Sequence, residues 1–172
     1  ADLLKIQGDI KFSNVTFSYD NNTEVIANIS FSIKPGERIA IMGATGSGKT
    51  SLVQLLPRLF EPTGGKIFLD GRLIEQYPIQ QLRNVIGFVP QEAHLFTGTI
   101  KENIAWGKRN ATMEEIVQAA KDAQIHETIL RFPKGYETVI GQKGVNLSGG
   151  QKQRLSIARA LVRKPKILIL DD

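Results

Sequence analysis

The stretch Gly43-Ala44-Thr45-Gly46-Ser47-Gly48-Lys49-Thr50 decides the fold of this 172-residue chain. It fits the pattern G-x-x-x-x-G-K-[ST], a glycine-rich turn that joins a strand to a helix. Residues 38–42 before it form a short apolar run, typical of a strand covered on both faces. The residues after it have helical spacing at Leu52, Val53, Leu55 and Leu56. We therefore predict a phosphate-binding loop in an α/β fold, which these flanking elements favour over an accidental glycine turn.

The loop predicts a ligand with several phosphates and a metal ion. Its glycines let successive backbone N–H groups point at phosphate oxygens, and the helix near Lys49 adds the positive end of its dipole. Lys49 is expected to bridge the β- and γ-phosphates, and the Thr50 hydroxyl to bind Mg²⁺. A carboxylate is then expected at the end of a neighbouring strand, where the apolar run 167–170 ends in Asp171. Alone, this run fits a plain core strand equally well; together with the loop it predicts a metal ligand.

Composition narrows the classes of function. The chain has 41% hydrophobic and 23% charged residues, as one ordinary globular domain does. It has no cysteine, which excludes disulfides, a thiolate nucleophile and a cysteine-bound metal. The net charge of +5 raises the possibility of nucleic acid, but the basic residues are scattered and aromatic residues make up only 7%. No apolar stretch reaches the roughly 18 residues of a membrane helix, so we expect any membrane role to come through a partner.

Local patterns predict an antiparallel sheet, an α/β core and a helical insert. Alternating residues predict strands early in the chain, and capping-box patterns at Thr99 and Thr112 open helices in a mainly helical region from Gln91 to Asn146. The expected strands span 10–12, 15–19, 29–33, 66–70, 85–89 and 166–171, and the expected helices of the core span 78–84 and 149–163.

A second serine- and glycine-rich segment, Leu147-Ser148-Gly149-Gly150-Gln151, opens the helix 149–163. It predicts another helix start with free backbone amides, and one nucleotide does not need both. With both motifs present, the chain resembles the nucleotide-binding domain of ATP-binding cassette (ABC) transporters, whose signature motif is LSGGQ. The resemblance covers nearly the whole chain.

The resemblance implies a P-loop NTPase (RecA-like) α/β core with an N-terminal antiparallel β subdomain and an inserted α-helical subdomain. Residues 1–172 would form one domain, incomplete at the C-terminus. Its β subdomain and P-loop core would span 1–90 and 159–172, and its mainly helical signature subdomain 91–158. ATP and Mg²⁺ are the implied cofactors. Two such domains pack head to tail, so that Ser148, Gly149, Gly150 and Gln151 close over the γ-phosphate bound by the partner's loop.

Two further residues receive roles from the resemblance. Tyr19 resembles the aromatic residue that stacks on adenine, although an ordinary strand tyrosine fits the same position. Gln91 resembles the glutamine that contacts Mg²⁺ and the attacking water; a solvated loop residue is the alternative. The run 95–104, with Trp106-Gly107 behind it, is similar to the exporter branch. That similarity implies transmembrane domains in the same full-length chain and a position on the cytoplasmic face of the cell membrane.

The sequence departs from the family's pattern at the catalytic acid. Asp172 stands where the family normally has a glutamate that polarises the attacking water, so the catalytic set would be Lys49, Gln91 and Asp172. Aspartate places its carboxylate about an ångström farther back, which can cost about a hundredfold in rate. The implied assembly is a heterodimeric exporter, in which this chain forms the degenerate site and its partner has the normal glutamate. Exporters also tend to have Gly-Glu-x-Gly where this chain has Gly141-Gln142-Lys143-Gly144.

Alternatives remain open at this point. The sequence ends before the D-loop and the switch histidine of the family, so we expect the fragment alone to be nearly inactive as an ATPase. A non-hydrolysing ATP-binding regulatory subunit is the main alternative, because of Asp172. A soluble cassette ATPase acting on nucleic acid or ribosomes is disfavoured by the exporter-like segment 96–106 and by the scattered charge.

Overall fold

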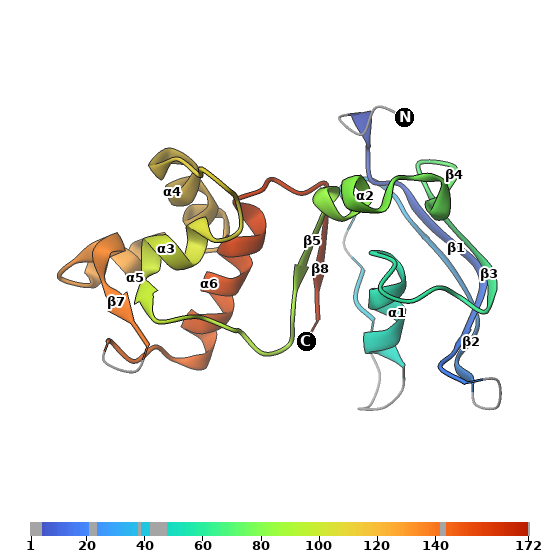
Figure 1. Ribbon diagram of the computed structural model, residues 1–172, viewed down its shortest axis with the longest axis horizontal. Helices are drawn as coiled ribbons and strands as arrows, with labels where there is room; N and C mark the ends of the chain where they lie inside the picture. The colour runs from blue at the N-terminus through green and yellow to red at the C-terminus, as the bar shows by residue number, and fades with distance from the viewer. Residues whose placement is uncertain (1–4, 21–23, 38, 42–47, 142–143, 172) are drawn as a thin grey trace. The chain divides into compact units, whose positions relative to one another are not determined.

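The computed structural model describes residues 5–20, 24–37, 39–41, 48–141 and 144–171. They divide into two compact units, Ala1–Ile86 and Gly87–Asp172, which are described separately (Figure 1).

An antiparallel four-stranded sheet forms most of the first unit, in the order β2-β1-β3-β4 (Figure 1). Strand β1 (Ile10–Ser18) pairs with β2 (Glu24–Ile33) on one side and β3 (Gly64–Leu69) on the other. The short β4 (Arg72–Leu73) completes the sheet beside β3. Alternate residues of β1 are buried on either side of a register shift between Phe12 and Val15, which is the pattern of a strand with one face against a core. These buried residues are Ile10, Phe12, Val15 and Phe17.

Short helices complete the first unit. Helix α1 (Lys49–Leu55) buries Leu52 and Leu55 and ends before Pro57, as expected from its spacing. A 3-10 turn, η2 (Ile74–Gln76), and helix α2 (Ile79–Val85) follow β4.

The strand expected over residues 38–42 is not found. Residues 39–41 belong to no strand, Ile39 is 49% exposed, and residues 38 and 42 lie outside the described residues. A strand is stable only when it exchanges hydrogen bonds with a neighbouring strand. In the described part of the chain, residues 39–41 pair with none of the strands.

The second unit has a helical core and two pairs of strands, one of them formed by β5 (Ile86–Val89) and β8 (Ile167–Leu170). Helices α3 (Ile100–Ala105), α4 (Met113–Asp122), α5 (His126–Arg131) and α6 (Gly149–Leu161) share one hydrophobic cluster. The residues in it include Ile100, Ile104, Ile116, Ala120, Ile129, Leu155 and Ala158. The short β6 (Gly98–Thr99) pairs with β7 (Val139–Ile140), and η3 (Gly135–Glu137) precedes β7. None of the helices in the described ranges is long and apolar enough to span a membrane.

The two expected capping boxes form to different extents. The Thr112 hydroxyl accepts a hydrogen bond from the Glu115 amide at 3.1 Å, and the Glu115 carboxylate accepts one from the Thr112 amide at 3.0 Å. At Thr99 the hydroxyl accepts from the Glu102 amide at 3.0 Å. The capping box at Thr112 is therefore complete, whereas at Thr99 the structure shows one of the two hydrogen bonds.

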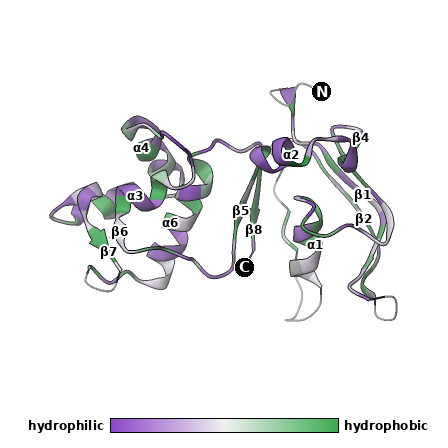
Figure 2. Ribbon diagram, viewed as in Figure 1, coloured by the Kyte–Doolittle hydropathy of each residue, from purple (hydrophilic) through white to green (hydrophobic). Residues whose placement is uncertain are grey.

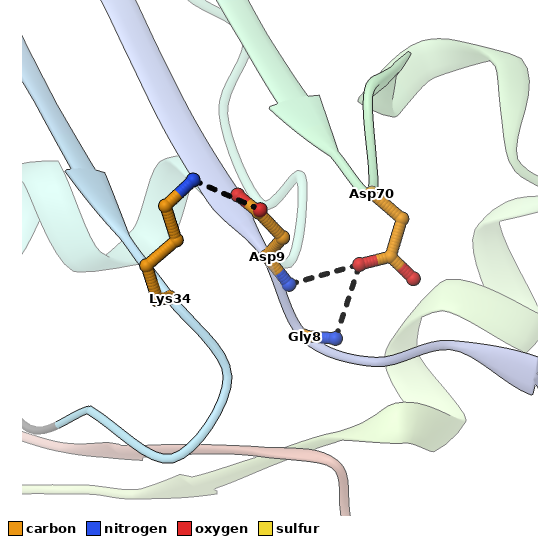
Figure 3. A network of polar contacts seen from close by, with 4 residues as sticks. All are labelled: Gly8, Asp9, Lys34 and Asp70. Carbon is orange, nitrogen blue, oxygen red and sulfur yellow. Dashed lines mark hydrogen bonds and ion pairs between the residues drawn. The ribbon is translucent and has the colours of Figure 1, made fainter.

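The carboxylate of Asp70 anchors the segment that leads into β1 (Figure 3). It accepts hydrogen bonds from three consecutive backbone amides, those of Gln7 at 2.7 Å, Gly8 at 3.1 Å and Asp9 at 2.8 Å. The Asp70 amide donates in return to the Asp9 carbonyl at 2.7 Å. Lys34 forms an exposed ion pair with Asp9 at 3.4 Å. The turn between β3 and β4 thus binds the backbone ahead of the sheet's central strand.

Replacing Asp70 with alanine is expected to lower the free energy of unfolding of the first unit by about 2 kcal/mol, because three amides lose a charged acceptor. Asp9→Ala is the matched control, since it removes only the exposed ion pair and should cost less than about 1 kcal/mol. Urea unfolding of both variants measures the difference. If Asp70→Ala costs no more than Asp9→Ala, the carboxylate does not anchor this segment.

Candidate functional site

The end of the glycine loop has a backbone that only glycine adopts without strain. Gly48 has a φ of +91° and directly precedes helix α1, which begins at Lys49. A Cβ atom at Gly48 would lie 2.5 Å from the carbonyl oxygen of Val25 in β2. The predictions for residues 43–47 and for the side chains of Lys49 and Thr50 lie outside what the structure describes. Gly48 therefore allows α1 to start directly against β2.

Tyr19 lies against the helix that follows the loop. Its hydroxyl is 2.7 Å from the hydroxyl of Ser51 on α1. Two rings meet it edge to face, Phe17 at 4.7 Å and Phe60 at 5.2 Å between centroids, yet Tyr19 remains 59% exposed. The ring is thus held in place and open to solvent, as a planar ligand requires. Sequence reasoning missed Ser51 and Phe60; only the position of Ser51 directly after the motif offered a signal.

Gln91 and Asp171 emerge at the same end of a strand pair. Strands β5 (Ile86–Val89) and β8 (Ile167–Leu170) form a two-stranded sheet, and Figure 2 shows both as hydrophobic. The Asp171 amide donates to the Val89 carbonyl at 2.9 Å, so Asp171 is level with the end of β5. Gln91 is exposed and Asp171 is partly buried. Asp172 lies outside the described residues.

The donor chemistry of the expected metal ligands suits a hard cation. Thr50, Gln91 and Asp171 would offer a hydroxyl, an amide and a carboxylate oxygen, and Mg²⁺ prefers oxygen ligands. Of the three, the structure brings Gln91 and Asp171 to one strand end, as described above.

Helix α6 begins with a complete capping box. The Ser148 hydroxyl accepts from the Gln151 amide at 3.2 Å, and the Gln151 side chain accepts from the Ser148 amide at 3.0 Å. The expectation of free amides is therefore wrong for Ser148 and Gln151, because these two residues satisfy each other.

Gly149 and Gly150 are exposed, and no described residue requires glycine at either position. Among the residues that the structure describes, a Cβ atom at Gly149 would meet nothing within 4 Å, and at Gly150 only the Arg154 guanidinium at 3.8 Å. Neither residue has a positive φ. The two glycines thus leave this helix start open to close approach from outside, although the space around them would accept an alanine.

The predicted residues therefore form three groups: Tyr19 beside α1, Gln91 with Asp171, and the start of α6. The sequence motif that ends directly at the start of helix α1, together with an acid at a strand end, is typical of a P-loop protein that binds nucleotide phosphates. The family model for ABC transporters matches residues 26–172. The chain belongs to the ABC transporter family, whose ATP-binding domains are ATPases.

Relatives of known sequence and structure agree with this family assignment, and a solved structure confirms the expected P-loop NTPase fold with an antiparallel sheet and helices. The chain is 61% identical over 169 residues to the uncharacterized ABC transporter ATP-binding protein YfiB of Bacillus subtilis (strain 168), covering 98% of this chain and 30% of YfiB. It is 48% identical over 169 residues to the putative multidrug export ATP-binding/permease protein YgaD of the same organism, covering 98% of this chain and 29% of YgaD. A solved structure of a bacterial Atm1-family ABC exporter with ATP bound matches with a TM-score of 0.85 and 43% identity, covering 96% of this chain and 29% of that one. The chain thus spans about 30% of the length of these proteins.

Proposed function

We propose that this chain is the ATP-driven motor domain of an ABC exporter, and that two such domains close head to tail around ATP and Mg²⁺. The observation that carries this proposal is the open helix start at Gly149 and Gly150, where no contact among the described residues explains the glycines. A second domain that brings a bound triphosphate against these residues explains them, because phosphate oxygens then reach the helix backbone and its positive dipole end.

Each group of residues has a defined task in this proposal. The loop ending at Gly48 holds the phosphates with Lys49, and the exposed ring of Tyr19 stacks on adenine. Thr50, Gln91 and Asp171 hold Mg²⁺, which neutralises developing phosphate charge. Gln91 also orients the attacking water. Ser148, Gly149, Gly150 and Gln151 complete the site of the partner domain.

The relatives support a transmembrane partner. The chain spans about 30% of proteins that include an export permease and an Atm1-family exporter. Trp106 is 75% exposed and lies edge-on to Phe96, with 5.3 Å between ring centroids. A large exposed aromatic of this kind suits a protein contact, and we assign it to transmembrane domains on the cytoplasmic face of the membrane. Nucleic acid is not part of the proposal.

Asp172 makes this chain's own site the degenerate one of a heterodimer. Its partner has the normal glutamate, and this chain's Ser148 and glycines complete that competent site. A non-hydrolysing regulatory subunit is the second candidate, also favoured by Asp172. In both cases the chain binds ATP, and the two differ in whether the assembly hydrolyses it.

Asp172→Glu in the assembled transporter is expected to raise hydrolysis at this chain's own site by about 10- to 100-fold, because the longer side chain brings the carboxylate to the attacking water. Single-turnover hydrolysis with the partner's glutamate replaced by glutamine isolates that site. The matched control is Asp172→Asn, which should lower the residual rate. Hydrolysis that already depends mainly on Lys49 and Asp172 of this chain would contradict the degenerate assignment, and a wild-type assembly without ATPase activity would favour the regulatory subunit.

A further inference from the structure

All three guanidinium nitrogens of Arg159 donate hydrogen bonds to residues more than 50 positions earlier in the sequence. Its Nη1 donates to the His94 carbonyl at 2.6 Å, and its Nε donates to the Asn103 carbonyl at 2.9 Å. Its Nη2 donates to the Asn103 side-chain oxygen at 3.0 Å. The same group lies over the ring of Phe96, 5.7 Å from the centroid. Arg159 on α6 thus holds both the loop after Gln91 and the helix α3.

Asn103 on α3 also binds the backbone of that loop. It is only 1% exposed, and its amide group donates to the carbonyls of Phe96 and Thr99, each at 3.0 Å. Its side-chain oxygen accepts from the Phe96 amide at 3.0 Å and also from Arg159. Both N–H donors and the oxygen are therefore satisfied, which makes this a rigid polar network in a buried place.

The backbone just after α3 is also in close contact with α6 beside this network. A Cβ atom at Gly107 would overlap the Arg159 carbonyl and lie 2.9 Å from a methyl group of Val162. Gly107 does not need glycine for its φ, so the requirement is space alone. Burial lowers the pKa of Arg159 from its usual value, and all the acceptors named above are neutral. The planar fork therefore serves to fix carbonyl groups in place rather than to neutralise an acid.

We propose that Arg159 and Asn103 are positioning residues that join the segment 94–99, which follows Gln91, to the signature helix α6 as one rigid piece. Ser148 caps α6 about 16 Å from Arg159 along the helix. The segment 94–99 and the start of α6 therefore respond together when nucleotide binds, because these two side chains hold them in one arrangement. This inference rests on the proposed function, and it adds two positioning residues within this chain.

The test uses the full-length transporter with ATPγS and Mg²⁺. Arg159→Ala and Arg159→Lys are compared with Arg131→Ala, an exposed arginine on α5 of the same unit. Hydrogen exchange at residues 92–99 and 148–155 with and without ATPγS measures the coupling, and ATPase kinetics give kcat and KM. In Arg159→Ala we expect kcat to fall at least about tenfold with KM within about twofold, and the ATPγS-dependent protection of 148–155 to disappear.

Arg159→Lys is the variant expected to keep the domain folded, because its ammonium group still donates to the carbonyls. It lacks the planar guanidinium fork, so it tests that geometry. We expect it to show intermediate kcat and partial protection, and Arg131→Ala to behave as wild type. If Arg159→Lys has full ATPγS-dependent protection and wild-type kcat, or if both Arg159 variants lose activity only in proportion to the unfolded fraction, the inference is wrong. A wild-type protein without any protection at 148–151 contradicts the proposed function instead.

Discussion

Gly150→Asp is expected to lower the rate of ATP turnover by at least about 100-fold, while the domain stays as stable as before or becomes slightly more stable. The stability follows from the space around Gly150, where a Cβ meets the Arg154 guanidinium at 3.8 Å and no other described side chain or backbone atom within 4 Å. An acid in the first turn of α6 also interacts favourably with the helix dipole, by about 0.3–1 kcal/mol. The same negative charge lies where the partner's γ-phosphate approaches, and like charges repel there. Stability and activity therefore change in opposite directions.

Thermal unfolding and ATPase activity of the same preparation measure the two effects. Gly150→Ala is the matched control, since it adds bulk without charge and should reduce turnover less. In a heterodimer the loss appears at the partner's site, because this chain's signature helix covers that site. A Gly150→Asp assembly with more than about a tenth of wild-type turnover would show that no phosphate is bound against this helix.

Gly48→Ala is expected to lower both stability and nucleotide binding. At a φ of +91° an alanine is strained, at about 1–2 kcal/mol, and its Cβ would lie 2.5 Å from the Val25 carbonyl. The start of α1 must then shift away from β2, which displaces Lys49. We expect ATP affinity to fall at least about tenfold.

Lys49→Ala is the comparison that separates the two causes. It removes the cation but leaves the backbone of Gly48 unchanged, so it should abolish binding and turnover with little change in the melting temperature. Urea unfolding and titration with a fluorescent ATP analogue measure both quantities. Wild-type stability in Gly48→Ala would contradict the strained approach of α1 to β2.

Local sequence patterns predicted much of the fold because they are local in cause. Alternating residues marked β1, and Thr112 and Ser148 marked helix starts through side chains that bind amides three residues away. The segment 38–42 shows the limit of this reasoning, since an apolar run does not say whether a partner strand lies beside it.

Sequence patterns did not predict the contacts between segments that are distant in the sequence. Arg159 binds Asn103 and His94, which precede it by 56 and 65 residues, and Asp70 binds Gln7 across 63 residues. No spacing rule marks such pairs. The motifs placed glycines at both candidate phosphate sites, but only geometry separated Gly48, which the fold requires, from Gly150, which it does not.

The Asp70 carboxylate has a mechanical consequence. Tension applied to the chain ahead of Gln7 is first borne by the three hydrogen bonds between these backbone amides and the Asp70 carboxylate. Only after them does it reach the hydrogen bonds that pair β1 with its neighbouring strands. The bonds to Asp70 load together, and the pull is spread into β3 and then the whole sheet instead of opening β1 one residue at a time. The domain is therefore built to resist peeling at the point where its polypeptide enters.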